Sequence, residues 1–290
     1  MYPSRFNYKA PTSLDEAIAL LTAHDDAKVL AGGQSLIPMM KLRFAAPAML
    51  VDINNIPGLD KHGAESDGSY RIGALVRHAH LEKSKSLPGH QPLIASAAHL
   101  VADPIVRTRG TFVGSVCHAD PQGDWASVMV ALGGSIISQG PNGKRTTVVS
   151  DFVAGPFQTV LARNEIAIEA VIPAAKGTRA GGYLKLERRV GDFATAGVAL
   201  ALDMSGSTVN DAGIGLTGVG AQTINASEAA AALIGSTLDN DAVENAARLA
   251  AETANPRSDH RGSADYKRHV IATFVKRIIA NVQHAEMQVA

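Results

Sequence analysis

Apolar residues recur at helical spacing near the start of the chain, where one face of a predicted helix would carry Leu14, Ala17, Ile18 and Leu21. Ser13 stands just before them and Glu16 three positions later, an arrangement typical of a capping box, so a helix is predicted to begin here. Short apolar runs bounded by turn residues predict strands over 28–30, 49–53 and 69–75. Helical patterns follow over 77–86 and over 92–107, the second interrupted by Pro104.

In the second half of the chain, segments with the apolar pattern of helices alternate with segments that have the pattern of strands. A helix is predicted over 125–132, and strands over 135–138 and 165–172. Turn residues and small residues cluster over 173–178, which makes this segment the best candidate for a domain boundary. Beyond it, three strands and then three helices are predicted, over 183–189, 194–204, 212–219, 227–234, 241–253 and 266–282. This order predicts an α+β fold with a larger first part, and a smaller second part that combines a three-stranded sheet with helices.

Composition narrows the classes of function. Lys and Arg together number 27, as do Asp and Glu, so the zero net charge favours neither a nucleic acid nor an anionic membrane as a partner. No apolar run approaches the roughly 20 residues that a membrane-spanning helix needs, and the N-terminus lacks the features of a signal peptide. The single Cys117 can form no internal disulfide and cannot alone hold an iron–sulfur cluster or a thiolate zinc site. We therefore expect a cytoplasmic chain that binds no metal, because its histidines also lack metal-ligand spacing.

A glycine tract follows the predicted strand over 28–30. Gly32 and Gly33 permit positive φ and close approach of a ligand, and successive inward N–H groups would form a concavity that suits a pyrophosphate. Gln34 and Ser35 could bond phosphate or ribityl oxygens, although the tract could equally be a structural turn. The apolar residues 36–40 could wall a flavin or enter the core. Because G-x-G-x-x-G is missing, a nicotinamide-binding Rossmann domain is disfavoured.

A second glycine-containing tract, over 109–124, is predicted to be irregular. Its first residues would offer another close approach, with hydroxyls from Thr111 and Ser115. Asp124 ends the tract just before a predicted helix. It could cap that helix or accept hydrogen bonds from ribityl hydroxyls.

The two tracts resemble the FAD motifs of the medium, flavoprotein subunits of molybdenum hydroxylases, the family of xanthine dehydrogenase and carbon monoxide dehydrogenase. Residues 30–43 (LAGGQSLIPMMKLR) are similar to the first motif and residues 107–124 to the second. Segments 151–155 and 165–166 resemble a third region, 183–185 and 191–194 the segment that approaches the isoalloxazine ring, and 259–266 part of the closing domain. The likeness covers nearly the whole chain in the family's order.

The resemblance implies an architecture and a set of partners. Residues 1–176 would form a vanillyl-alcohol-oxidase (PCMH) type FAD-binding domain with subdomains of about 1–58 and 59–176, and residues 177–290 a CO dehydrogenase flavoprotein C-terminal-like domain. FAD would sit in this chain, 2Fe–2S clusters in a small partner chain, and molybdopterin with molybdenum in a large one, as a dimer of heterotrimers. The residues implied to contact FAD are Leu30, Ala31, Gly32, Gly33, Gln34, Ser35, Leu36, Thr111, Gly114, Ser115, Ala119, Asp124, Ile166, Lys185, Asp192 and Phe193.

Several of these positions have alternatives or depart from the family pattern. Lys185 could pair with a flavin carbonyl or be a surface charge, and Asp192 could be a turn residue. Many relatives have Gly in place of Val113 and Asn in place of Ser115. Because valine disfavours positive φ, we expect Val113 to be extended. Phe193 stands where some carbon monoxide dehydrogenases have Tyr. The phenyl ring of Phe193 would retain any stacking but would lack the hydrogen bond of the tyrosine hydroxyl.

Three functions compete. In the first, the chain is an electron-transfer subunit without catalytic residues for substrate chemistry, which belongs to the large chain and would oxidise an N-heterocycle, an aldehyde or ketone, or CO. In the second, it is a self-contained FAD-dependent oxidase or dehydrogenase, which would need an acid–base pair that the sequence does not offer convincingly. In the third, it is a binding module that has lost the cofactor, against which both glycine tracts and Asp124 argue. Replacing Gly32 with Val is expected to weaken FAD binding while leaving folding largely intact.

Overall fold

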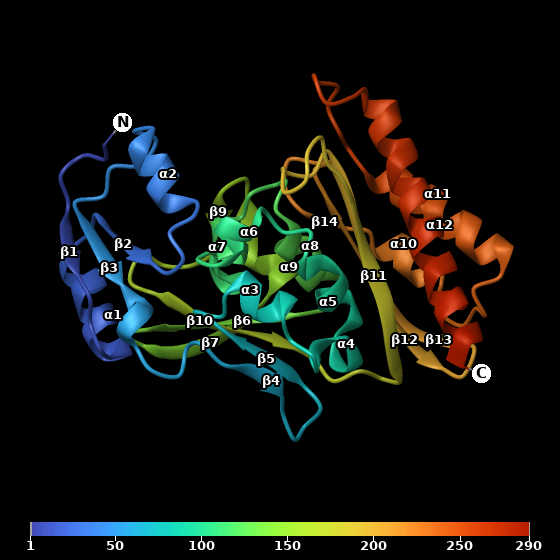
Figure 1. Ribbon diagram of the computed structural model, residues 1–290, viewed down its shortest axis with the longest axis horizontal. Helices are drawn as coiled ribbons and strands as arrows, with labels where there is room; N and C mark the ends of the chain where they lie inside the picture. The colour runs from blue at the N-terminus through green and yellow to red at the C-terminus, as the bar shows by residue number, and fades with distance from the viewer. Residues whose placement is uncertain (1, 290) are drawn as a thin grey trace.

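Within residues 2–289, which the computed structural model describes, three main sheets follow one another along the chain (Figure 1). The first is a small parallel sheet of order β1-β3-β2, made of β1 (Asn7–Lys9), β3 (Met49–Asp52) and β2 (Ala27–Leu30). Helix α1 (Leu14–Ala23) connects β1 to β2 and buries the predicted apolar face. The Ser13 hydroxyl accepts a hydrogen bond from the Glu16 N–H at 3.2 Å, which confirms the predicted start of the helix.

Two short helices follow the ends of these strands. Helix α2 (Leu36–Lys41) comes directly after the first glycine tract, and a 3-10 turn, η1 (Ile53–Asn55), follows β3. Of residues 36–40 only Met40 is buried, so this segment does not enter the core as a whole. Since parallel strands end at the same edge of a sheet, the glycine tract after β2 lies beside residues 52–54 after β3.

The second sheet is antiparallel and has the order β4-β5-β10-β6-β7. Its strands are β4 (His62–Ala64), β5 (Tyr70–Gly73), β10 (Ile166–Ile172), β6 (Ser135–Gly140) and β7 (Gly143–Val148). Short helices accompany it, namely α3 (His78–Glu82), α4 (Leu87–His90), α5 (Pro92–Ala98), α6 (Pro104–Arg107), α7 (Phe112–His118), α8 (Asp124–Ala131) and α9 (Val149–Phe152). A small hairpin of β8 (Val153–Gly155) and β9 (Gln158–Thr159) lies between β7 and β10 in the sequence.

Four sequence predictions need correction in this region. The helix predicted over 77–86 is shortened to α3, since α4 begins only at Leu87, and the helix predicted over 92–107 is divided into α5 and α6. The tract predicted to be irregular contains α7, in which Phe112, Val113 and Val116 are buried. Val113 is therefore helical, not extended as expected, because burial in the core outweighs the low helix propensity of valine.

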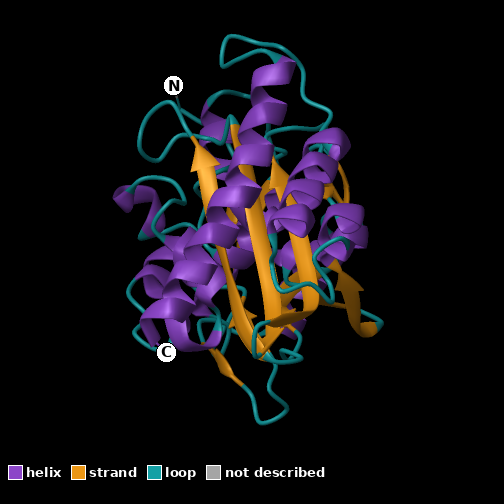
Figure 2. Ribbon diagram, turned by 90° about the vertical axis from the view of Figure 1, so that its right-hand side faces the viewer, coloured by secondary structure: helices purple, strands orange, loops and turns teal. Residues whose placement is uncertain are grey.

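The third sheet has the order β11-β12-β13-β14 and is antiparallel. Its strands are β11 (Thr178–Leu186), β12 (Ala196–Ser205), β13 (Thr208–Thr217) and β14 (Ile224–Asn225), so the predicted three-stranded sheet gains a short fourth strand. Helices α10 (Ser227–Ala231), α11 (Asn240–Thr253) and α12 (Ala264–Val289) lie across one face (Figure 2). The two faces of β12 enter different cores. Ala199 and Ala201 join the core of the first part, whereas Val198 and Leu200 join the core beneath the C-terminal helices.

Helix α8 covers the other face of this sheet at very short range. A Cβ on Gly213 would lie 2.0 Å from the carbonyl oxygen of Ala131, and one on Gly215 would lie 2.1 Å from that of Ser127. The two glycines of β13 therefore allow the helix backbone to rest on the strand. This contact brings the start of α8 beside the end of β11, where one group of predicted site residues meets.

Candidate functional site

A groove of about 290 Å³ lies where the first glycine tract meets the ends of β2 and β3. Its walls combine backbone from the tract with polar side chains from three other segments. The lining residues are Leu30, Ala31, Gly32, Gly33, Gln34, Ile37, Pro38, Lys41, Asp52, Asn54 and Arg109. Five of the predicted site residues, 30–34, thus share one groove with two cationic side chains.

The two glycine tracts touch each other at Gly32. A Cβ built on Gly32 would lie 2.5 Å from the carbonyl oxygen of Arg109, 2.8 Å from the Cα of Gly110 and 3.0 Å from the nitrogen of Thr111. The close approach that this glycine permits is therefore between two protein backbones. Replacing Gly32 with Val would push the tracts apart, so the expectation that folding stays largely intact needs correction.

The first tract presents a row of free backbone donors. Within the described part of the chain, the N–H groups of residues 32–36 donate to no protein acceptor, although Gly33 accepts from Ile37 and Ser35 accepts from Met39. Gly33 has a φ of +73°, which glycine adopts readily and which turns the following peptide. Gln34 is exposed, and its side-chain amide donates to the Gly32 carbonyl at 3.3 Å. Successive free amides of this kind form a concavity suited to an anion.

The second tract is more closed than its sequence suggested. The Thr111 hydroxyl caps α7 by accepting from the Gly114 N–H at 3.2 Å, and a Cβ on Gly114 would lie 2.4 Å from that hydroxyl oxygen. Ser115 lies within the helix, with its N–H bonded to the Thr111 carbonyl. Ala119 ends the helix at a φ of +50° and is buried. Glycine at 114 thus accommodates a helix cap.

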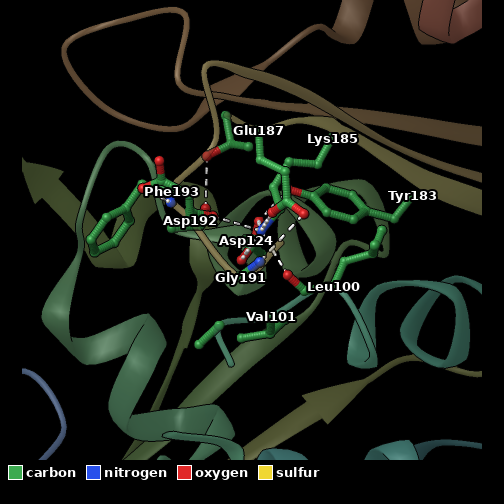
Figure 3. A network of polar contacts seen from close by, with 12 residues as sticks. Leu100, Val101, Asp124, Tyr183, Lys185, Glu187, Gly191, Asp192 and Phe193 are labelled. Carbon is green, nitrogen blue, oxygen red and sulfur yellow. Dashed lines mark hydrogen bonds and ion pairs between the residues drawn. The ribbon is translucent and has the colours of Figure 1, made fainter. Parts of the chain in front are cut away.

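A second group of predicted residues gathers around Lys185, and we call Asp124, Tyr183, Lys185, Glu187 and Asp192 the Lys185 cluster (Figure 3). The Lys185 side chain is fully buried, so it is not a surface charge. Its ammonium donates to the Leu100 carbonyl at 2.7 Å and the Asp192 carbonyl at 3.1 Å. It also pairs with Asp124 at 3.4 Å and with Glu187 at 3.2 Å.

Asp124 is the deepest carboxylate of this cluster. It is the first residue of α8, and its Oδ1 accepts a hydrogen bond of 2.6 Å from the Tyr183 hydroxyl. Burial raises the pKa of Asp124 above its ordinary value, against the opposing effects of Lys185 and Tyr183. Burial, followed by the charge of Asp124, raises the pKa of Tyr183 well above its ordinary value. Both oxygens of Asp124 are engaged by protein groups, so contact with a ribityl hydroxyl would require rearrangement.

Asp192 and Phe193 lie at the outer side of the cluster. The Phe193 N–H and the guanidinium of Arg261 lower the pKa of Asp192, and Arg261 also donates to the Phe193 carbonyl at 2.8 Å. The Oδ2 atom of Asp192 is buried without a hydrogen-bond partner in the described residues, although it forms an ion pair with Arg188 at 3.6 Å. The Phe193 ring is about half exposed, 51%. Phe193, unlike Lys185, is therefore accessible to a ligand.

The remaining predicted positions fall elsewhere. Ile166 is the first residue of β10, pairs with Gln139 and is buried, so its side chain lines neither the groove nor the cluster. Ser35 and Leu36 adjoin the groove without lining it. Ile37 and Pro38, which also line the groove, belong to the apolar segment 36–40 that the sequence offered as a possible flavin wall. The groove residues that the sequence did not single out are Lys41, Asp52, Asn54 and Arg109.

Three general properties of the described residues complete the site. No group of three or more His, Cys, Asp or Glu side chains is arranged to hold a metal ion among them. Burial raises the pKa of the Cys117 thiol to about 12, which fits a packed side chain and no redox role. No helix in the part of the chain that the structure describes is long and apolar enough to cross a membrane.

Comparison with known families assigns this architecture to a class. Residues 4–175 match the FAD binding domain in molybdopterin dehydrogenase, and residues 182–282 match the CO dehydrogenase flavoprotein C-terminal domain. The two matches together cover most of the chain in the order that the sequence predicted. The chain is thus a flavoprotein of the molybdopterin dehydrogenase class, with FAD as its own cofactor.

Individual relatives are similar to this chain over nearly their whole lengths. The carbon monoxide dehydrogenase medium chain of Hydrogenophaga pseudoflava is 43% identical over 96% of this chain and 97% of the relative. The nicotine 6-hydroxylase medium subunit of Paenarthrobacter nicotinovorans is 36% identical over 94% of this chain and 95% of the relative. A solved structure of the Hydrogenophaga pseudoflava enzyme superposes with a TM-score of 0.92 at 42% identity and covers 98% of this chain and 99% of the solved one. The chain belongs to the medium, FAD-binding subunits of molybdenum hydroxylases such as carbon monoxide dehydrogenase, which confirms the predicted family, fold class and oxidoreductase assignment.

Proposed function

We propose that this chain is the electron-transfer subunit of a heterotrimeric molybdenum hydroxylase and that the groove beside Gly32 holds the pyrophosphate of its FAD. The observation that carries the site assignment is the row of free N–H groups over residues 32–36, flanked by the cationic Lys41 and Arg109. A pyrophosphate carries two negative charges and many acceptor oxygens, and this wall offers donors without competing protein acceptors. When bound, FAD accepts electrons from one redox partner and passes them to another.

The other end of the cofactor would lie toward Asp192 and Phe193. The Asp192 carboxylate has a buried oxygen that accepts no hydrogen bond from the described residues and lies 3.6 Å from the Arg188 guanidinium, and the exposed Phe193 side chain offers a face for stacking. Lys185 and Asp124 would act from beneath, since their polar groups are already paired with one another. In this assignment the chain binds and orients the cofactor, and no residue of it performs substrate chemistry.

The partner chains follow from the kind of subunit this is. Relatives are named medium chain or medium subunit, which supports a complex with a small chain carrying 2Fe–2S clusters and a large chain carrying molybdopterin and molybdenum, as a dimer of heterotrimers. The relatives named for carbon monoxide and for nicotine support CO or an N-heterocycle as substrate, with an aldehyde as a further candidate, oxidised on the large chain. The external acceptor would be reduced at the FAD of this chain. The boundary between residues 176 and 177 is part of the proposal, and β11 begins at Thr178.

Titration of the purified chain with FAD tests the site. We expect quenching of flavin fluorescence with one FAD per chain, and competition by ADP, which shares the pyrophosphate but lacks the flavin. A chain that binds no FAD would contradict the proposal. Binding that ADP does not compete would show that the pyrophosphate lies outside the groove. Co-purification with partner chains, followed by analysis for iron and molybdenum, tests the assembly separately.

A further inference from the structure

Three segments that are distant in the sequence meet behind the groove and are joined by two side chains. Asn54 donates from Nδ2 to the Ala31 carbonyl at 2.8 Å, so it connects the end of β3 to the first glycine tract. Arg77 donates from Nη2 to the Oδ1 of Asn54 and from Nη1 to the Arg109 carbonyl, at the start of the second tract. A continuous path of hydrogen bonds therefore runs from Ala31 through Asn54 and Arg77 to Arg109.

Arg77 itself does not line the groove. It precedes α3, is half-buried, and forms a β-bridge with Thr111, so its backbone as well as its side chain contacts the second tract. Burial, followed by the neighbouring charge of Arg109, lowers the pKa of Arg77, while Asp52 acts in the opposite direction. Because Arg77 does not line the groove, it can affect the groove only by fixing the positions of the groups that it joins, Asn54 and the Arg109 carbonyl.

The geometry of the peptide bond gives this path a consequence for the free donors. In a trans peptide the C=O and the following N–H point in opposite directions. Since Asn54 holds the Ala31 carbonyl, the Gly32 N–H of the same peptide is fixed on the side opposite to Asn54. Arg77 holds the carbonyl of Arg109, the same oxygen against which Gly32 packs. The separation of the two tracts and the direction of the first free donor thus depend on the same pair of side chains.

We propose that Arg77 and Asn54 are positioning residues that fix the two glycine tracts at the separation required by the FAD pyrophosphate. The inference rests on the proposed FAD site and adds to it two side chains, one of which would touch no part of the cofactor. Their effect is on the geometry of the pyrophosphate wall, while the Lys185 cluster and the flavin ring are left unchanged.

The test measures FAD and ADP affinities of the full chain in the wild type, Arg77→Gln and Arg77→Lys. Removing a residue that orients a metal ligand typically weakens metal binding roughly 10- to 100-fold, and by analogy we expect a loss in that range for Arg77→Gln, equal for FAD and ADP. Arg77→Lys keeps the charge but lacks the planar pair of N–H directions, so it should recover only part of the affinity. At saturating FAD the visible spectrum of the bound flavin should match that of the wild type, because the ring end is not altered.

Arg71→Gln is the matched control, since it also removes an arginine of the first part whose partner, Glu169, lies outside the groove. It should bind FAD as the wild type does. Wild-type FAD affinity in Arg77→Gln would overturn the inference and leave the proposed site standing, as would an FAD loss without an equal ADP loss. Absence of FAD binding in the wild type would overturn the proposed site itself. If Arg77→Gln does not fold, Arg77→Lys decides alone, with weakened binding at an unchanged unfolding midpoint as support and unchanged binding as contradiction.

Discussion

The groove and the Lys185 cluster hold half of the predicted cofactor residues, yet the two regions are built on opposite principles. In the groove the donors are backbone N–H groups that have no protein acceptor. In the cluster nearly every polar group is already paired, and the central ammonium contacts four oxygen partners from two carbonyls and two carboxylates. The groove therefore has hydrogen-bond donors that remain free for a ligand, whereas the polar groups of the cluster bind one another and join Asp124 of α8 to Lys185 of β11.

The difference shows that a polar residue in a cofactor motif can serve either the ligand or the protein beneath it. Free donors gain hydrogen bonds when an anion binds, so their contribution is to affinity. Buried, paired charges lose much if one partner is removed, so their contribution is to the folded state. The two regions should therefore respond differently to substitution.

The largest loss of stability is expected for Lys185→Met. It leaves the buried carboxylates of Asp124 and Glu187 without their cation, and breaking a buried ion pair typically costs about 3–5 kcal/mol. Denaturant unfolding of the apo chain measures the difference. Under conditions where the variant is folded, its ADP affinity should equal that of the wild type.

Lys276→Met is the control for Lys185→Met. Lys276 pairs with Glu244 at the surface, with both side chains more than a third exposed, and such pairs contribute about 0–1 kcal/mol. If Lys185→Met cost no more than this control, the cluster would not be a stabilising buried network. A large loss of ADP affinity in folded Lys185→Met would remove the distinction between the two regions.

Lowering the pH should reduce the free energy of unfolding through His78, which lies beside the second glycine tract. Its ring lies beneath Gly110, and its Nδ1 accepts a 3.0 Å hydrogen bond from the indole N–H of Trp125. Because an indole N–H only donates, Nδ1 must be unprotonated. Burial, followed by the charges of Arg107 and Arg77, lowers the pKa of His78 from 6.5 to about 4.

The sign of the effect follows from that depressed pKa. Below pH 6.5 the unfolded chain takes up a proton that the folded chain refuses, so stability is present above this pH and is lost as the pH falls toward about 4. The loss is about 1.4 kcal/mol per pH unit and up to about 3 kcal/mol over the window. His78→Gln keeps a neutral acceptor for Trp125, and its unfolding free energy should fall less steeply between these pH values. Identical slopes for the two proteins would contradict the assignment.

Within the Lys185 cluster, Asp124 gives stability the opposite dependence on pH. Burial raises its pKa above the ordinary 3.8, so its contribution is fully present below that pH and is lost as the pH rises through the folded value. A fall in pH therefore lowers the free energy of unfolding through His78 and raises it through Asp124. The slope that remains in His78→Gln includes this second effect.

The sequence predicted features that depend on neighbours along the chain. The helix cap at Ser13 and the turn at Gly33 are local, and both occur where the pattern placed them. The apolar run over 194–204 also predicted its strand, although only the fold shows that alternate residues of β12 enter two different cores. Local pattern and family resemblance together were enough for the fold class.

The parts that could not be predicted depend on tertiary contacts. Helix α7 forms despite Val113 and Gly114, because its apolar face is buried and Thr111 caps it. Arg77 reaches Asn54 and Arg109 across 23 and 32 positions, a separation at which no spacing pattern exists. Lys185 is buried because an aspartate 61 positions earlier lies beside it, whereas most lysines are solvated.

Gly32→Ala, the smallest of the three changes in stability, separates affinity from stability most directly. The added Cβ would lie within 2.8 Å of the Arg109 carbonyl oxygen and the Gly110 Cα, and because both are backbone atoms they can yield only if the two tracts move apart. Overpacking of this kind costs about 1–3 kcal/mol. FAD affinity should fall more than that of any variant in the Lys185 cluster, since the substitution widens the proposed pyrophosphate site. Gly63→Ala is the control, because a Cβ there has nothing within 4 Å, and it should change stability by no more than about 0.5 kcal/mol. If Gly32→Ala lost stability and kept its FAD affinity, the contact between the tracts would be structural only, and the groove would owe its donors to Gly33 and the residues after it.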